Sequence, residues 1–255
     1  MMDTQGQEQN LIIKPRQVLF VFGGAGIIVL ILSYISQYLR LFPDSYNIHS
    51  PFQADLIHDF IAEFDFNGQP NIAIYYNVLT LNVAACLLFI IAYFKNILKD
   101  AYRFYWIAMA WMVLFFSIDN LAEIHEKINL YFQGTAAVGG WSEYTWVIAG
   151  VAGIVILAVL FRRFWLHLDT KYRFLFLASV ILYFAGILGK EVTRLHASKD
   201  FIYSLYITFE QGLQYGGATL LIYSLLLYIL FVFPRFFVST KDLTDKSRNV
   251  QQDTN

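Results

Sequence analysis

Carboxylates stand at the ends of two apolar stretches that are too short to cross a bilayer without them. Residues 104–118 form a run of 15 uncharged residues that ends at Asp119, and residues 174–189 form a run of 16 that ends at Lys190 and Glu191. A membrane-spanning helix needs roughly 20 residues. Asp119 and Glu191 are therefore expected inside the membrane or at its edge, where ionisable groups are costly and usually functional.

The segment that follows the first run carries three acids and a histidine. In a continuous helix, Asp119, Glu123 and Glu126 would fall within about 60° of one another, and His125 would project about 120° from Asp119. Ser117 adds a hydroxyl two residues before the first acid. The spacing thus predicts three carboxylates on one helix face.

Two later segments carry polar residues of similar kinds. Glu191 follows a glycine-rich stretch and precedes Arg194 and His196. Glu210 and Gln214 are four residues apart, so a helix would stack their side chains on one face. If these helix ends converge with the end of the third span, they form one polar pocket.

Several carboxylates in a low-dielectric pocket cannot all stay ionised, so protons, cationic side chains or a bound cation must neutralise them. Carboxylate oxygens with one or two imidazoles suit a divalent metal, which could activate water for hydrolysis of a lipid or envelope substrate. This hypothesis assigns catalysis to Asp119, Glu126 and Glu191, and metal binding to Asp119, His125, Glu126, Glu191 and Glu210. The supporting residues are Ser117, Glu123, Arg194, His196 and Gln214.

Other interpretations fit the same residues. The polar side chains could form a network that pins helices together, with Glu191 bonded to Arg194, or they could carry protons or ions in a coupled transporter. A pair of haem ligands, His125 and His196, is a weaker possibility. Transport needs a polar route across the whole membrane, and the inner halves of the last three predicted spans carry almost no ionisable residues.

The elements that must position these residues are membrane-spanning helices. With 58% hydrophobic residues and a mean hydropathy of +0.51, the chain is too apolar for a soluble domain. Six uncharged stretches predict an all-α, polytopic bundle, because a lipid-exposed backbone must satisfy its own hydrogen bonds. The predicted spans are 17–39, 72–94, 104 to about 122, 144–161, 174 to about 193, and about 211–233.

The segments outside the spans differ in character. Ser50-Pro51-Phe52-Gln53 is a helix start, and the pattern to residue 64 predicts an extracytoplasmic amphipathic helix. This helix could lie on the outer leaflet, but its acidic face favours a roof over the bundle. The membrane domain is expected over 14–238. Residues 1–13 and 239–255 are polar and are expected to be disordered cytoplasmic tails.

Charge distribution predicts the orientation of the chain. One set of predicted loops and both tails hold 13 of the 18 Lys and Arg residues, so the positive-inside rule places both termini in the cytoplasm. The opposite side holds 12 of the 19 acids. The net charge of −1 gives no sign of nucleic-acid binding, no basic patch interleaved with aromatic residues is present, and membrane lipids are the expected partners. Cys86 is the only cysteine, so one chain cannot form a disulfide. Oligomeric state is left open.

Several short motifs carry a resemblance. They are Ser117-x-Asp119 with Ile124-His125-Glu126, Phe64-Asp65 and Asn71, Gly189-x-Glu191, and Tyr206 to Glu210. Together they resemble an uncharacterised family of bacterial multi-pass membrane proteins over about residues 60–230. The resemblance implies a bacterial inner-membrane location and no particular reaction. The sequence departs from it at Ala73, which replaces a proline, and at Asn120, Gln211 and Gln214, which replace acids. Ser117, Asp119 and His125 also resemble membrane-embedded ceramidase-like hydrolases, whose late-helix histidine pair is missing here.

Overall fold

Seven helices make up the part of the chain that the computed structural model describes, which is residues 14–43, 50–66, 71–124, 127–128, 131, 145–194 and 200–233. Within 145–149, at 154 and within 190–194 only the backbone is described. The helices are α1 (Pro15–Leu41), α2 (Pro51–Phe64), α3 (Ile72–Ile97), α4 (Arg103–Ala122), α6 (Thr145–His167), α7 (Thr170–Arg194) and α8 (Phe201–Val232). All except α2 are long and apolar enough to cross a membrane. The prediction of an all-α membrane protein with six candidate spans is confirmed. The predicted tails lie outside the described residues.

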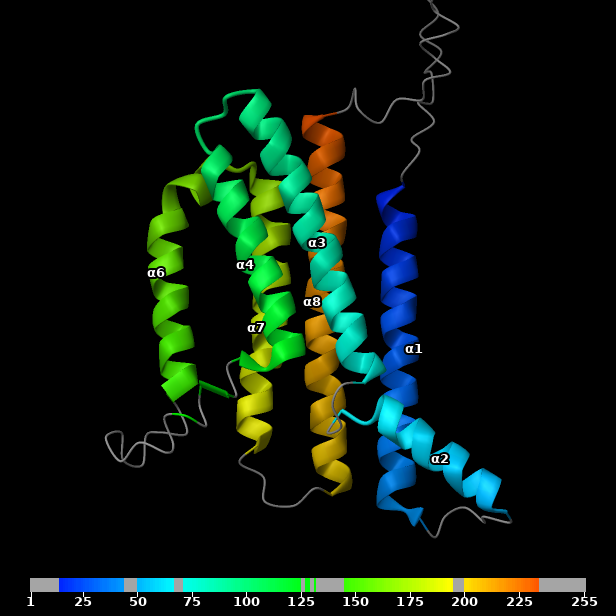
Figure 1. The fold of residues 1–255 in the computed structure, drawn as a ribbon. Helices are drawn as coiled ribbons and strands as arrows, with labels where there is room; N and C mark the ends of the chain where they lie inside the picture. Colours follow the sequence, from blue (N-terminus) through cyan, green and yellow to red (C-terminus); the bar gives the residue numbers. More distant parts are fainter. Residues whose placement is uncertain are drawn as a thin grey trace, which may run out of the picture.

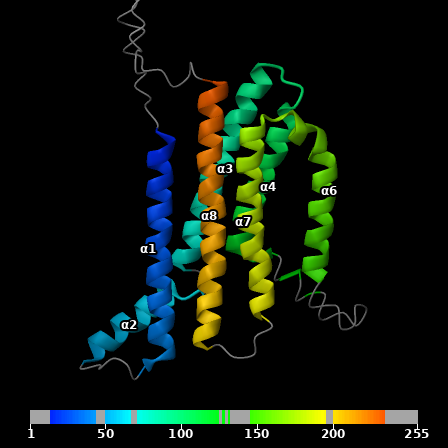
Figure 2. The same ribbon diagram turned by 180° about the vertical axis from the view of Figure 1, so that it is seen from behind.

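The six long helices run alternately up and down (Figures 1 and 2). α8 packs against α1, α3 and α7, whereas α4 packs against α3, and α6 lies at the edge beside α7. The start of α1, the end of α8 and the α3–α4 and α6–α7 turns lie at one end, the basic end. Its described cations are Lys14, Arg16, Lys95, Lys99, Arg103, Arg162, Arg163, Lys171 and Arg173. The opposite, acidic end carries Asp55, Asp59, Glu63, Asp65, Asp119, Glu123, Asp200 and Glu210.

Side-chain caps fix where three helices begin. The Ser50 hydroxyl accepts a hydrogen bond from the backbone N–H of Gln53, as the sequence predicts for the start of α2. Asn71 caps α3 in the same way. Asp200 caps α8 through the N–H of Tyr203, so this helix starts about ten residues earlier than the predicted span. Glu210 therefore lies within a continuous helix rather than before it.

The position of α2 differs from the sequence-based expectation. It packs against α1 and α3 and none of its residues is buried. Figure 1 shows it slanting away from the bundle beside α1. The prediction that α2 roofs the bundle is wrong, because its apolar residues Phe52 and Leu56 are exposed instead of packed on helix ends. An apolar face of this kind suits a lipid interface.

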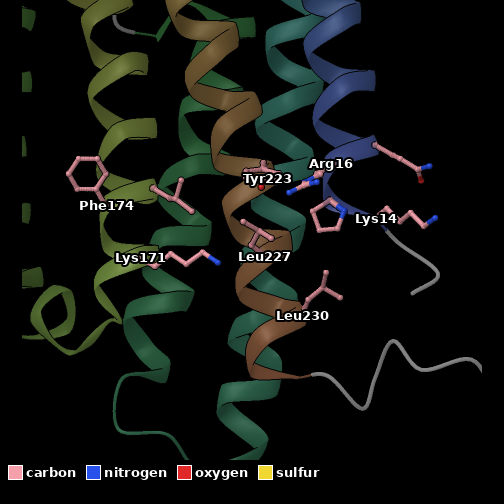
Figure 3. A pocket seen from close by; sticks show the side chains of 10 residues that line it. Lys14, Arg16, Lys171, Phe174, Tyr223, Leu227 and Leu230 are labelled. Carbon is pink, nitrogen blue, oxygen red and sulfur yellow. The ribbon is translucent and has the colours of Figure 1, made fainter. Parts of the chain in front are cut away.

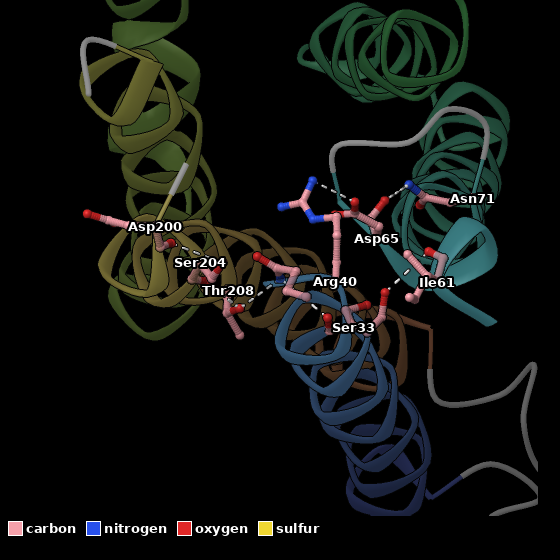
Figure 4. A network of polar contacts seen from close by, with 10 residues as sticks. Ser33, Arg40, Ile61, Asp65, Asn71, Asp200, Ser204 and Thr208 are labelled. Carbon is pink, nitrogen blue, oxygen red and sulfur yellow. Dashed lines mark hydrogen bonds and ion pairs between the residues drawn. The ribbon is translucent and has the colours of Figure 1, made fainter. Parts of the chain in front are cut away.

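In α1 the usual inside–outside pattern of a soluble helix is reversed. Its buried residues are Gly26, Ser33, Ser36 and Gln37, whereas large apolar residues such as Phe20 and Ile27 are exposed. Small and polar residues let membrane helices approach and bond, while apolar ones face lipid. Figure 4 shows Thr208 of α8 beside this buried strip, where it accepts a hydrogen bond of 3.3 Å from the Gln37 amide.

Candidate functional site

Four side chains from four helices form a hydrogen-bonded cluster in the half of the bundle nearer the acidic end. We call Asn77, Asn120, Tyr183 and Gln214 the amide–tyrosine network. Nδ2 of Asn77 lies 3.1 Å from Oε1 of Gln214 and 3.4 Å from both Oδ1 of Asn120 and the Tyr183 hydroxyl. Nδ2 of Asn120 donates to the same hydroxyl at 3.0 Å. The network thereby joins α3, α4, α7 and α8.

Asn77 is the centre of this network, and its side-chain oxygen is not used by the network's hydrogen bonds. Its amide nitrogen has two protons and can serve two of its three neighbours at once. Its Oδ1 is buried and accepts no hydrogen bond from the described residues. An unsatisfied buried carbonyl costs about 1–3 kcal/mol, which a bound donor or cation could offset.

Two buried acids adjoin the network. Asp119 directly precedes Asn120 and lies close enough to Tyr183 to interact with it electrostatically. Glu210 lies one turn before Gln214 on α8. Each residue is only 6% exposed. The structure thus buries two of the predicted metal-binding acids on neighbouring elements of one polar cluster.

Glycines bring α7 against Glu210. A β-carbon added at Gly189 would lie 2.8 Å from Cγ and 3.1 Å from Oε1 of Glu210. One added at Gly186 would lie 2.5 Å from the Glu210 carbonyl oxygen. At Gly186 a β-carbon would collide with the α8 backbone, so only glycine permits this approach, and at Gly189 it would force the Glu210 side chain to shift. Since Gly189 precedes Glu191 by two residues, Glu210 lies against the end of α7 that carries Glu191.

The predicted face of three carboxylates is wrong, because the helix does not continue through it. α4 ends at Ala122, and Glu123 takes a left-handed conformation with φ 52°. The N–H of Lys127 then donates to the Glu123 carbonyl, which begins a separate helical turn. Ser117, a predicted supporting residue, is buried and donates its hydroxyl proton to the Val78 carbonyl, so it ties α4 to α3.

Several other predicted site residues cannot be placed by side chain. His125, Glu126 and His196 lie outside the described residues, and for Glu191 and Arg194 the structure describes the backbone of α7 alone. Among the residues that are described, no three His, Cys, Asp or Glu side chains converge closely enough to hold a metal ion. Cys86 is exposed on α3.

Sequence reasoning missed the central part played by Tyr183, which lies within an uninterrupted apolar run and stands out by no motif. No motif of the sequence analysis includes Asn77. Asn120 and Gln214 stand out in the sequence only as departures from a pattern in which acids are common. The structure instead makes these two amides the partners of Asn77, because an amide can both donate and accept while a carboxylate only accepts.

A second polar cluster lies at the acidic end beside α2 (Figure 4). Nη1 of Arg40 forms an ion pair of 2.9 Å with Asp65, whose carbonyl accepts a hydrogen bond of 2.7 Å from Asn71. The Ser36 hydroxyl donates to the Ile61 carbonyl. These contacts hold the α2–α3 connection against α1. They explain the Phe64-Asp65 and Asn71 pattern as structural.

Comparison with known proteins identifies the family of the chain but no characterised relative. No curated protein and no solved structure matches it. The model of a family described as a domain of unknown function, DUF8692, matches residues 18–229, which include all six candidate spans for most of their length. The chain therefore belongs to the uncharacterised DUF8692 family.

Proposed function

We propose that this multi-pass membrane protein binds a divalent cation in the acidic half of its bundle, with Asp119 and Glu210 as ligands. The observation that carries the proposal is the burial of both carboxylates beside one amide–tyrosine network. A carboxylate held in a low-dielectric interior needs a proton, a cationic side chain or a bound cation. A cation bound beside the network would serve both acids.

The donor atoms near the two acids suit a hard cation. Carboxylate oxygens and the buried Oδ1 of Asn77 are the kinds of ligand that Mg²⁺, Ca²⁺ or Mn²⁺ prefer. His125, Glu126 and Glu191 remain proposed ligands that would complete the shell. A bound divalent ion would lower the pKa of a coordinated water, and hydrolysis of a lipid or envelope substrate is the reaction that this would support.

The orientation and location are part of the same proposal. Nine described Lys and Arg residues gather at the basic end, which supports a cytoplasmic position for both termini. The acidic end then faces away from the cytoplasm, in a bacterial inner membrane. A substrate would reach Asp119 and Glu210 from that side.

Elemental mass spectrometry of the purified full-length protein in detergent tests the proposal. The wild type should carry a near-stoichiometric divalent metal, and Asp119→Asn, Glu210→Gln and Glu191→Gln should each lose most of it. Glu63→Gln, which changes an exposed acid on α2, should keep it. A folded wild type without enriched metal would overturn the proposal.

A pair of glycine variants sharpens this test without removing any charge. Gly189→Ala places a β-carbon 2.8 Å from Cγ of Glu210 and should displace its carboxylate, so metal content should fall. Gly216→Ala, where nothing lies within 4 Å, is the matched control and should keep it. Equal metal in both variants would count against Glu210 as a ligand.

A second candidate function is structural. The internal hydrogen bonds of the amide–tyrosine network favour it, because they already join four helices. In that case Asp119→Asn and Glu210→Gln would lower thermal stability and leave the metal content at the level of the wild type. The two measurements together distinguish the candidates.

A further inference from the structure

A cleft of about 760 Å³ opens at the basic end, on the opposite side of the membrane from the polar cluster. The start of α1 forms one wall, the start of α7 another, and α8 lies between them, since both helices pack against it. Figure 3 shows Arg16 and Lys171 approaching from opposite sides, with Tyr223 and Leu227 between them.

Three cations border this cleft without a described acid to balance them. Lys14, Arg16 and Lys171 line it, and its described lining contains no acidic side chain. No ion pair engages these three residues within the described part of the chain. Other cations at this end do have partners: Lys95 bonds Asp100, and Arg173 donates to two backbone carbonyls at the end of α6. The charge at the cleft is therefore available to an anion.

The rest of the lining is apolar. Phe174 and Leu175 lie about one turn beyond Lys171 on α7, in the direction of the bilayer interior, and Leu227 and Leu230 form the apolar wall on α8. An inorganic anion would gain nothing from this surface, whereas an acyl chain would bury it. Basic pockets between transmembrane helices, next to apolar walls, recognise the head groups of anionic lipids.

We propose that this cleft is a binding site for an anionic phospholipid. The phosphate contacts Lys14, Arg16 and Lys171, and an acyl chain lies against Phe174, Leu175 and Leu227. The Tyr223 hydroxyl is placed to donate a further hydrogen bond to the head group. The bound lipid bridges α1 and α7 and holds both on α8. The site is independent of the metal proposed at the acidic end.

Native mass spectrometry of the full-length protein in detergent tests this site. Phosphatidylglycerol and phosphatidylcholine with identical acyl chains serve as probes. Each cation near a membrane surface favours an anionic lipid by on the order of fivefold. Phosphatidylglycerol should therefore bind at least about tenfold more tightly than phosphatidylcholine. Excess inorganic phosphate should not displace it.

The variants separate this cleft from general charge attraction. Lys14→Gln, Arg16→Gln and Lys171→Gln combined should abolish the preference for phosphatidylglycerol. Arg162→Gln with Arg163→Gln removes two exposed cations from α6 at the same end and should preserve it. Leu175→Trp fills the apolar part, keeps every charge and should weaken binding of both lipids. Equal binding of both lipids by the wild type, full displacement by phosphate, or an unchanged preference in the triple variant would overturn the proposal.

Discussion

Helices α3, α4, α7 and α8 are built from different kinds of side chain in their two halves. Towards the acidic end, α4 and α8 present Asp119, Asn120 and Gln214 to the interior. Towards the basic end, the same helices present Trp106 and Tyr228, whose ring centroids are 4.8 Å apart. The polar half is held by directional hydrogen bonds, and the aromatic half by close packing.

This difference bears on what the protein can do. Trp106 also packs against Phe164 of α6 and Phe176 of α7, and all three residues are at most 1% exposed. Leu88 and Leu225 complete this core with no exposed surface. An ion that entered from the acidic end would meet an apolar, close-packed layer rather than a polar route. This apolar layer supports the proposed cation site over the transport alternative.

Breaking the aromatic half should have the largest effect on stability. Trp106→Ala removes a side chain that is 1% exposed and contacts α6, α7 and α8, and it should lower the free energy of unfolding by about 3–5 kcal/mol. Unfolding in mixed detergent micelles measures the loss. Trp111→Ala, on the same helix but 60% exposed, is the control and should change stability by about 0.5 kcal/mol or less. Similar losses in both would mean that the aromatic layer is not a packed core.

Disrupting the polar half should lower the free energy of unfolding by a smaller amount. Asn77→Ala removes the centre of the amide–tyrosine network and leaves Tyr183 and Gln214 with fewer partners, so we expect a loss of about 1–3 kcal/mol in the same unfolding assay. Asn82→Ala lies on the same helix and removes no described hydrogen bond. A loss in Asn82→Ala as large as in Asn77→Ala would show that helix polarity, rather than the network, sets the stability of this half.

The contrast between the halves also explains which features the sequence could predict. Composition and run length suffice for six spans, because the bilayer imposes one length and one hydrogen-bonding solution on each of them. Caps such as Ser50 are local, so the start of α2 was predictable. Its docking on α1 was not, since it depends on the long-range pair of Arg40 and Asp65.

The candidate site shows the same limit more sharply. The position of Asp119 could be predicted from the apolar run that ends at it, whereas the place of Glu210 within a continuous helix could not, because α8 starts about ten residues before the predicted span. The loss of the shared face after Ala122 could not, because it results from a single backbone conformation at Glu123. Tyr183 was equally hidden, since its hydroxyl matters only once three other helices surround it.

The smallest expected change in stability comes from the turn between α3 and α4, at the basic end of the aromatic half. Asp100 accepts hydrogen bonds of 2.8 Å from Lys95 and 2.7 Å from the N–H of Tyr102. Burial alone would raise the pKa of Asp100, but these two bonds and the charge of Lys95 outweigh it and lower that pKa. A carboxyl whose pKa is lower in the folded state stabilises the protein above its unfolded pKa of about 3.9, and this contribution disappears as the pH falls through the folded value.

Asp100→Asn should therefore lower the free energy of unfolding by about 0.2–1 kcal/mol at neutral pH and approach the wild type in acid. Unfolding measured as a function of pH checks this, with Lys99→Gln as an exposed control in the same turn. If the difference instead persists to the lowest pH at which the wild type stays folded, the bond to Tyr102, rather than the charge, stabilises the turn.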